Sequence, residues 1–119
     1  MNDSKTTIQE LKNLAKEFTE AREWSQFHNA KNLSMAIAAE AAELMEHFLW
    51  IDEKESSEKM MAKKEIIQEE VVDIMWMLLC LCNKYDIDLV SATHKKMIIN
   101  AQKYPIEKCK GRSEKYNEL

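Results

Sequence analysis

The sequence predicts an all-α protein whose helices pack like a four-helix bundle. Only one glycine and one proline occur in 119 residues, whereas a sheet protein of this size needs many turns rich in both. Apolar residues recur with the three- and four-residue spacing of helices along most of the chain. This length suffices for one hydrophobic core and leaves no room for a second, so we expect a single domain over residues 1–119.

A first helix is expected over residues 7–22. Its apolar positions lie about one turn apart: Ile8, Leu11, Ala15 and Phe18. Thr7 and Glu10 have the spacing of a capping box, which marks a helix N-terminus. Residues 22–32 mix aromatic and polar side chains without a period, so we expect an irregular loop there. Asn32 is the expected N-cap of a second helix that runs to about Trp50.

Two more helices are expected in the second half of the chain. Ser56 or Ser57 can cap a third helix, the longest, that continues to about Lys84. Asp88 can cap a fourth helix that ends near Lys103, where Pro105 follows as a stop signal. The tail, residues 108–119, is polar, and both disorder and an ordered arm are consistent with its composition.

Charge and apolar content exclude several classes of protein. The net charge is −4 and no basic run precedes the tail, so duplex nucleic acid is not an expected partner. The longest uncharged apolar run, residues 74–82, is far shorter than the roughly 20 residues that span a membrane. The first ten residues lack the apolar segment of a signal peptide. Cys80, Cys82 and Cys109 are odd in number and are interpreted as reduced thiols, so we expect a soluble cytoplasmic protein.

Four carboxylates interrupt apolar stretches of the second and third expected helices: Glu40, Glu43, Glu70 and Asp73. Each pair is three residues apart, which places its two side chains on one helix face about one turn apart. On adjacent antiparallel helices the two pairs would converge. Burying unpaired carboxylates costs several kcal/mol each, so such a group needs cations. Ligands that offer only oxygen favour Mg²⁺, with Mn²⁺ as the alternative, over zinc.

These carboxylates have two other possible interpretations. Acidic residues on amphipathic helices are usually a solvated face, which explains residues 46, 65 and 69. It explains Glu40 and Asp73 poorly, because most of their neighbours are apolar. A di-iron site is the second alternative, since Glu43 and His47 are four residues apart. It is the weaker one, because di-iron bundles repeat Glu-x-x-His on two helices.

Taken together, the motifs resemble a known family. They are REWSQFH at 22–28, ExxE at 40–43, EExxD at 69–73, KMIINAQKYP at 96–105 and RSEKYNEL at 112–119. The chain from about residue 10 onward resembles the MazG-like superfamily of all-α nucleoside triphosphate pyrophosphohydrolases, and within it most resembles the dCTP pyrophosphatases. The resemblance implies a dimer, or a tetramer made of two dimers, that uses Mg²⁺ to release a monophosphate and pyrophosphate.

The resemblance also implies roles for individual residues. Glu40, Glu43, Glu70 and Asp73 would be the metal ligands, and either Glu40 or Glu43 would orient or deprotonate the attacking water. Trp24 and His28 would lie at the nucleotide, with Trp50 in the base pocket. Asn100 has a donor and an acceptor for a cytosine edge, and Lys96, one turn earlier, suits a phosphate. Without the family match, both would be ordinary exposed residues.

Further phosphate contacts are expected among the basic residues Arg22, Lys31, Lys103, Lys110, Arg112 and Lys115. Met77 stands where dCTP-specific relatives often have a tyrosine near the sugar, so discrimination between deoxyribose and ribose is left open. Ile98 stands where some relatives have an acidic residue. Trp76 lies within an apolar run and is expected in the core or at a subunit interface.

We therefore expect a Mg²⁺-dependent enzyme that hydrolyses dCTP or a modified dCTP, with other deoxynucleoside triphosphates as alternatives. The competing hypothesis is a non-catalytic helical interaction protein with a structural metal site. A homo-oligomer is expected, a tetramer more than a dimer, because residues 74–82 are uncharged on every side. In a lone domain some of these residues would face water: Ile74, Trp76, Met77, Leu79, Cys80 and Leu81. The C-terminal segment with Arg112, Lys115 and Tyr116 would then reach a neighbouring subunit's phosphate pocket.

Overall fold

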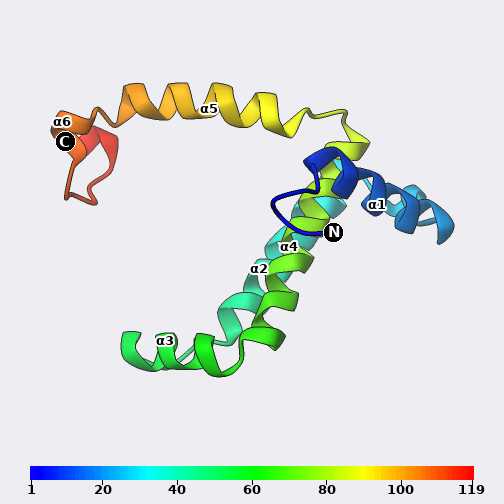
Figure 1. Ribbon diagram of the computed structural model, residues 1–119, viewed down its shortest axis with the longest axis horizontal. Helices are drawn as coiled ribbons and strands as arrows, with labels where there is room; N and C mark the ends of the chain where they lie inside the picture. The colour runs from blue at the N-terminus through cyan, green and yellow to red at the C-terminus, as the bar shows by residue number, and fades with distance from the viewer. The chain divides into compact units, whose positions relative to one another are not determined.

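The computed structural model describes all 119 residues, which form six α-helices, two short 3₁₀ helices and no strand (Figure 1). The predicted all-α class is confirmed. The chain divides into two compact units, Met1–Asp86 and Ile87–Leu119, which are described separately below. None of the helices combines the length and the apolar character that crossing a membrane requires.

Helix α1 (Ile8–Ala21) begins at the predicted capping box. The Glu10 amide donates to Thr7 Oγ1 at 3.1 Å, and the Thr7 amide donates to Glu10 Oε2 at 2.6 Å. The helix ends before Glu23, which has a left-handed backbone with φ 54°. A short 3₁₀ helix, η1 (Trp24–Phe27), follows within the segment predicted to be irregular.

Helix α2 (Ala30–Glu46) starts and ends earlier than predicted. Asn29, not Asn32, is its N-cap, because the Asn29 side chain accepts from the Asn32 amide at 2.9 Å. The Asn32 side chain instead donates to the Phe27 carbonyl at 2.9 Å, which ties the helix start to η1. The helix stops four residues short of Trp50, whose own backbone is left-handed with φ 65°.

The predicted third helix is two helices, α3 (Glu53–Ala62) and α4 (Lys64–Lys84). Asp52 caps α3 by accepting from the Glu55 amide at 2.8 Å, so the prediction of Ser56 or Ser57 as the cap was wrong. The backbone departs from helical geometry at Lys63. Helix α3 buries no side chain, whereas Ile67 is fully buried at the start of α4. The two helices therefore take different directions, with α3 turned away from α4 (Figure 1).

The core of the first unit lies where α4 packs against both α1 and α2 (Figure 1). Ala15, Leu33, Leu79 and Cys80 form its centre. Four partly buried side chains surround that centre: Leu11, Trp76, Met77 and Leu81. All three cysteines are free thiols, as predicted, and Cys80 and Cys82 are buried. Burial raises the pKa of the Cys80 thiol, which lies 3.8 Å from Thr19 Oγ1, so this thiol stays protonated at neutral pH.

Exposed apolar side chains lie on α2 and α4 at other positions than predicted. None of the residues predicted to face water from the apolar run is fully exposed, because α1 and α2 cover that half of α4. The exposed members of the run are Met75 and Leu78, at 37% and 41%. Large exposed apolar side chains also occur earlier on α4 and on α2: Ile66, Val71, Val72, Met35 and Met45. The first unit thus has an uncovered apolar surface on these two helices.

The second unit consists of α5 (Leu89–Lys103), a single turn α6 (Ile106–Cys109) and the 3₁₀ helix η2 (Tyr116–Glu118). Asp88 caps α5 as predicted, accepting from the Ser91 amide at 2.9 Å. The tail is an ordered arm. The Tyr116 ring packs edge-on against Tyr104 with centroids 6.1 Å apart, and Lys103 Nζ lies 4.9 Å from the Tyr116 centroid.

Candidate active site

Three of the four predicted carboxylates meet between two helices. Each of Glu40 and Glu43 on α2 and Glu70 on α4 offers one carboxylate oxygen, and these oxygens all lie within 4.8 Å of one another. Glu40 and Glu70 are partly buried and Glu43 is exposed. The meeting follows from the sequence, because residues three apart share a helix face and α2 packs along α4.

The charges of these groups act on one another. Burial raises the pKa of the Glu40 carboxyl first, followed by the charge of Glu43 and a hydrogen bond to its carboxyl. The charges of Asp73 and Glu70 raise the same pKa further. Asp73 is exposed and stands outside the three-residue group, but it is near enough to contribute to the field at Glu40. The site therefore attracts either a proton or a cation.

The donor set fits a hard divalent cation. Oxygens that bind the same Mg²⁺ at about 2.1 Å lie at most about 4.2 Å apart. Small side-chain rotations would bring the three carboxylates from their present spacing to that separation. Carboxylate oxygens are also the ligands that Mg²⁺ and Mn²⁺ prefer. Asp73 lies one turn after Glu70 on α4, outside the group of converging oxygens.

Glu40→Gln is expected to raise the melting temperature of the metal-free protein. A raised pKa means that the folded state holds the Glu40 proton more tightly than the unfolded state does, so ionisation at neutral pH destabilises the fold. The neutral amide removes this destabilisation. Thermal unfolding in the presence of a chelator measures the effect. Glu46→Gln, an exposed residue of the same helix, is the control, and a melting temperature for Glu40→Gln at or below that of the control would contradict the account.

His47 contacts a member of this cluster. Its Nε2 lies 3.3 Å from Glu70 Oε1, and it follows directly after the end of α2. The weaker di-iron interpretation grouped His47 with Glu43, whereas the structure brings the ring to Glu70. Sequence reasoning missed this contact because it joins two helices and leaves no spacing signal within either one.

An aromatic group lies near the start of η1. The Phe18 ring packs edge-on against Trp24 and Trp76, with centroids 5.8 Å and 5.0 Å away. Arg22 lies over the Phe18 ring at 3.4 Å and donates to the Phe18 carbonyl at 3.0 Å. Trp24 is thus held in place by packing. Arg22, predicted to contact phosphate, is engaged in this group.

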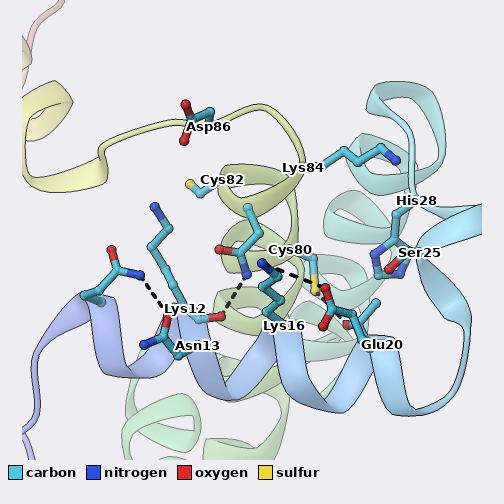
Figure 2. A pocket seen from close by; sticks show the side chains of 13 residues that line it. Lys12, Asn13, Lys16, Glu20, Ser25, His28, Cys80, Cys82, Lys84 and Asp86 are labelled. Carbon is cyan, nitrogen blue, oxygen red and sulfur yellow. Dashed lines mark hydrogen bonds and ion pairs between the residues drawn. The ribbon is translucent and has the colours of Figure 1, made fainter.

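His28 lines a pocket of about 410 Å³ between α1 and the end of α4 (Figure 2). Three lysines also line it: Lys12, Lys16 and Lys84. Lys16 pairs with Glu20 at 3.9 Å. Burial, and then the charge of Lys84, lower the pKa of His28, so its ring is neutral at pH 7. Sequence reasoning missed these lysines, because they are spread over α1 and α4 without a motif. Neither the four candidate metal-ligand carboxylates nor Trp24 line this pocket.

The other candidate residues of the first unit lie apart from that pocket. Trp50 is 98% exposed. Lys31 is exposed in the first turn of α2, and Met77 packs against the core. Met77 therefore acts here as a core side chain.

The remaining candidates belong to the second unit. Lys96 is exposed and Asn100 is partly buried, one turn apart on α5. Arg112 Nε lies 3.3 Å from Glu114 Oε2, so this guanidinium already has an acidic partner. Lys110 and Lys115 are exposed, and Lys103 and Tyr116 face each other as described above.

Comparisons with known proteins place these features in context. Residues 35–119 match the model of the MazG-like family, a span that includes all four carboxylates. The chain is 35% identical over 115 residues to proteins named dCTP pyrophosphatase 1 from Mus musculus and Homo sapiens, an alignment that covers 95% of this chain and 68% of each relative. A pyrophosphatase from Archaeoglobus fulgidus has a similar crystal structure. The TM-score is 0.80 at 34% identity, over 88% of this chain and 98% of that one.

Proposed function

This chain belongs to the MazG-like family and is a nucleotide pyrophosphatase, and from that membership we propose that it is a Mg²⁺-dependent enzyme that hydrolyses dCTP or a modified dCTP. The products would be the nucleoside monophosphate and pyrophosphate, with other deoxynucleoside triphosphates as poorer substrates. One observation carries the proposal: Glu40, Glu43 and Glu70 converge between α2 and α4, in a chain similar to dCTP pyrophosphatases.

In this proposal, Glu40, Glu43, Glu70 and Asp73 hold the cation, which is Mg²⁺ or Mn²⁺. When bound, the ion supplies positive charge between the carboxylates and the triphosphate and makes the attacking water more acidic. Either Glu40 or Glu43 orients that water and accepts its proton. The carboxylates alone would repel a triphosphate, so an enzyme without cation is expected to be inactive.

The nucleotide would lie against aromatic side chains. The Trp24 face would stack on the base, and Trp50, whose ring is uncovered, would join it. Neutral His28 would donate a hydrogen bond to the nucleotide. Asn100 would read the cytosine edge and Lys96 would contact phosphate. Further basic contacts would come from Lys31, Lys103 and Lys115, with Tyr116 beside Lys103.

The active form would be a homo-oligomer, a tetramer of two dimers rather than a single dimer. The uncovered apolar side chains of α2 and α4 support this proposal, because exposed apolar side chains gathered on neighbouring helices often mark an interaction surface. A second copy of the same surface, related by two-fold symmetry, is the simplest cover. The C-terminal arm would then complete a neighbouring subunit's pocket.

Steady-state kinetics with a panel of nucleoside triphosphates and Mg²⁺ tests the proposed substrate. We expect the highest kcat/KM with dCTP or 5-substituted dCTP, and no turnover in the presence of a chelator. The absence of turnover with every member of the panel would favour the non-catalytic interaction module. A preference for a purine nucleotide would support the pyrophosphatase activity but contradict cytosine as the recognised base.

Trp24→Ala and Asn100→Ala are expected to change recognition in different ways. Loss of a stacking face removes roughly 1–3 kcal/mol whatever the base, so Trp24→Ala should raise KM roughly tenfold or more for all substrates alike. Loss of a hydrogen bond to the base edge should narrow the ratio of kcat/KM between dCTP and dTTP by roughly two- to tenfold in Asn100→Ala. Full discrimination retained in Asn100→Ala would remove Asn100 from base recognition.

A further inference from the structure

His47 connects the end of α2 to the carboxylate cluster. Its Nε2 lies 3.3 Å from Glu70 Oε1, and the two side chains are only 22% and 20% exposed. Glu70 is one of the three residues whose carboxylate oxygens come together, and it is the only one of them on α4. The His47–Glu70 contact therefore joins the two helices that form the site at one of its proposed ligands.

The contact has a defined chemical direction. An ionised carboxylate only accepts hydrogen bonds, so the imidazole must donate through Nε2–H. The backbone of His47 is held at the end of the helix, since His47 is the C-cap of α2 and its amide donates to the carbonyls of the last helical turn. The Phe48 ring lies beside it, with centroids 6.4 Å apart. A donor so placed restricts the rotation of the Glu70 carboxylate.

His47 does not belong to the ligand group itself. Histidine nitrogens qualify as ligand atoms, yet only the three glutamates have donor atoms that all lie within 4.8 Å of one another. The ring thus contacts Glu70 without belonging to the three-residue group, as outer donors do at many metal sites. Such donors orient the ligating carboxylate, and their loss typically lowers metal affinity by about 10- to 100-fold.

We propose that His47 is a positioning residue for the metal site, an inference that rests on the proposed function. Nε2–H holds Glu70 Oε1, so that the carboxylate presents its other oxygen to the cation shared with Glu40 and Glu43. The role depends on a hydrogen bond donated from one particular atom. A side chain that places a donor at the same position should therefore preserve metal affinity. A side chain of similar size that lacks this donor should not.

Direct titration with Mn²⁺, followed through the EPR signal of free Mn²⁺, tests this role without measuring activity. We expect His47→Leu to weaken binding by about 10- to 100-fold relative to the wild type. His47→Gln, whose amide nitrogen reaches about as far as Nε2, should retain most of the affinity. His47→Asn, whose amide reaches only as far as Nδ1, should behave like His47→Leu. A higher Mn²⁺ affinity in His47→Gln than in His47→Asn would indicate a hydrogen-bond donor at the Nε2 position.

The control is His94→Leu on α5, which replaces an exposed histidine and should leave binding unchanged. Melting temperatures in the presence of a chelator separate positioning from general destabilisation. Equal Mn²⁺ affinity in the wild type and His47→Leu would overturn the role of His47 and leave the metal site intact. The role would also be overturned if the losses of Mn²⁺ affinity in His47→Gln and His47→Asn simply followed the decreases in their melting temperatures. A wild type that binds no Mn²⁺ would overturn the metal site and, with it, this inference.

Discussion

Asp73→Asn is expected to reduce turnover by more than about 100-fold, beyond the loss typical of an outer-shell substitution at a metal site. The substitution keeps the shape of the side chain and removes its charge, so the packing of α4 is unchanged while the site loses a proposed ligand. Asp73 already acts electrostatically on Glu40, which shows that it belongs to the same local field. The initial rate of pyrophosphate release with dCTP and Mg²⁺ measures the effect.

Thermal unfolding gives the same substitution a second readout. A cation at 100 times its Kd stabilises a folded protein by about 2.7 kcal/mol. Wild type should therefore melt several degrees higher in Mg²⁺, and Asp73→Asn should show a smaller rise. Glu69→Gln, which changes an exposed residue of the same helix, is the matched control and should respond like wild type. Unchanged Mg²⁺-dependent turnover in Asp73→Asn would remove Asp73 from the site.

Leu78→Lys is expected to dissociate the proposed oligomer and, with it, to abolish most of the activity. Val71, Met75 and Leu78 lie four and three residues apart on α4, so their exposed side chains form one stripe. Fully burying a leucine contributes about 1.5–3 kcal/mol. Leu78 is 41% exposed, so covering it would contribute part of that amount, in both copies of a two-fold interface. A lysine there would lose that contribution and add two charges that must be desolvated.

Light scattering at low micromolar concentration measures this effect. Wild type should give the mass of a dimer or, as proposed, a tetramer, and Leu78→Lys should approach the 14.0 kDa of one chain. Met61→Lys is the control, because Met61 is an exposed apolar residue of α3, outside the stripe. A fully active wild-type monomer would contradict both the interface and the proposed completion of the pocket by a second subunit.

Local signals predicted the helix starts where a single strong cap exists. Thr7 with Glu10 and Asp88 with Ser91 each form the predicted cap. The prediction failed where several caps compete, since Asn29 lies one turn before Asn32 and both could cap α2. The break at Lys63 has no proline or glycine to announce it. The only sign of it is the non-helical backbone of Lys63, which no local sequence pattern specifies.

For the candidate site, too, local spacing predicted one part of the geometry and the packing of helices determined the other. The spacing of Glu40 with Glu43 placed both on one face of α2, and packing against α4 brought Glu70 to them. The hydrogen bond between His47 and Glu70 depends on where α2 ends, and that end was predicted at Trp50 rather than at Glu46. Contacts of this kind need the relative position of two helices, which spacing along the chain does not contain.

We propose that the carboxylates of α2 and α4 form the metal site of an enzyme that cleaves a nucleoside triphosphate between its α- and β-phosphates. ³¹P NMR of dCTP incubated with the protein and Mg²⁺ tests it most directly, because every phosphorus product is seen in one spectrum. The account predicts resonances of dCMP and pyrophosphate, which stay absent when Glu40→Gln or a chelator is used. Resonances of dCDP and inorganic phosphate, or an unchanged dCTP spectrum with the wild type, would contradict it.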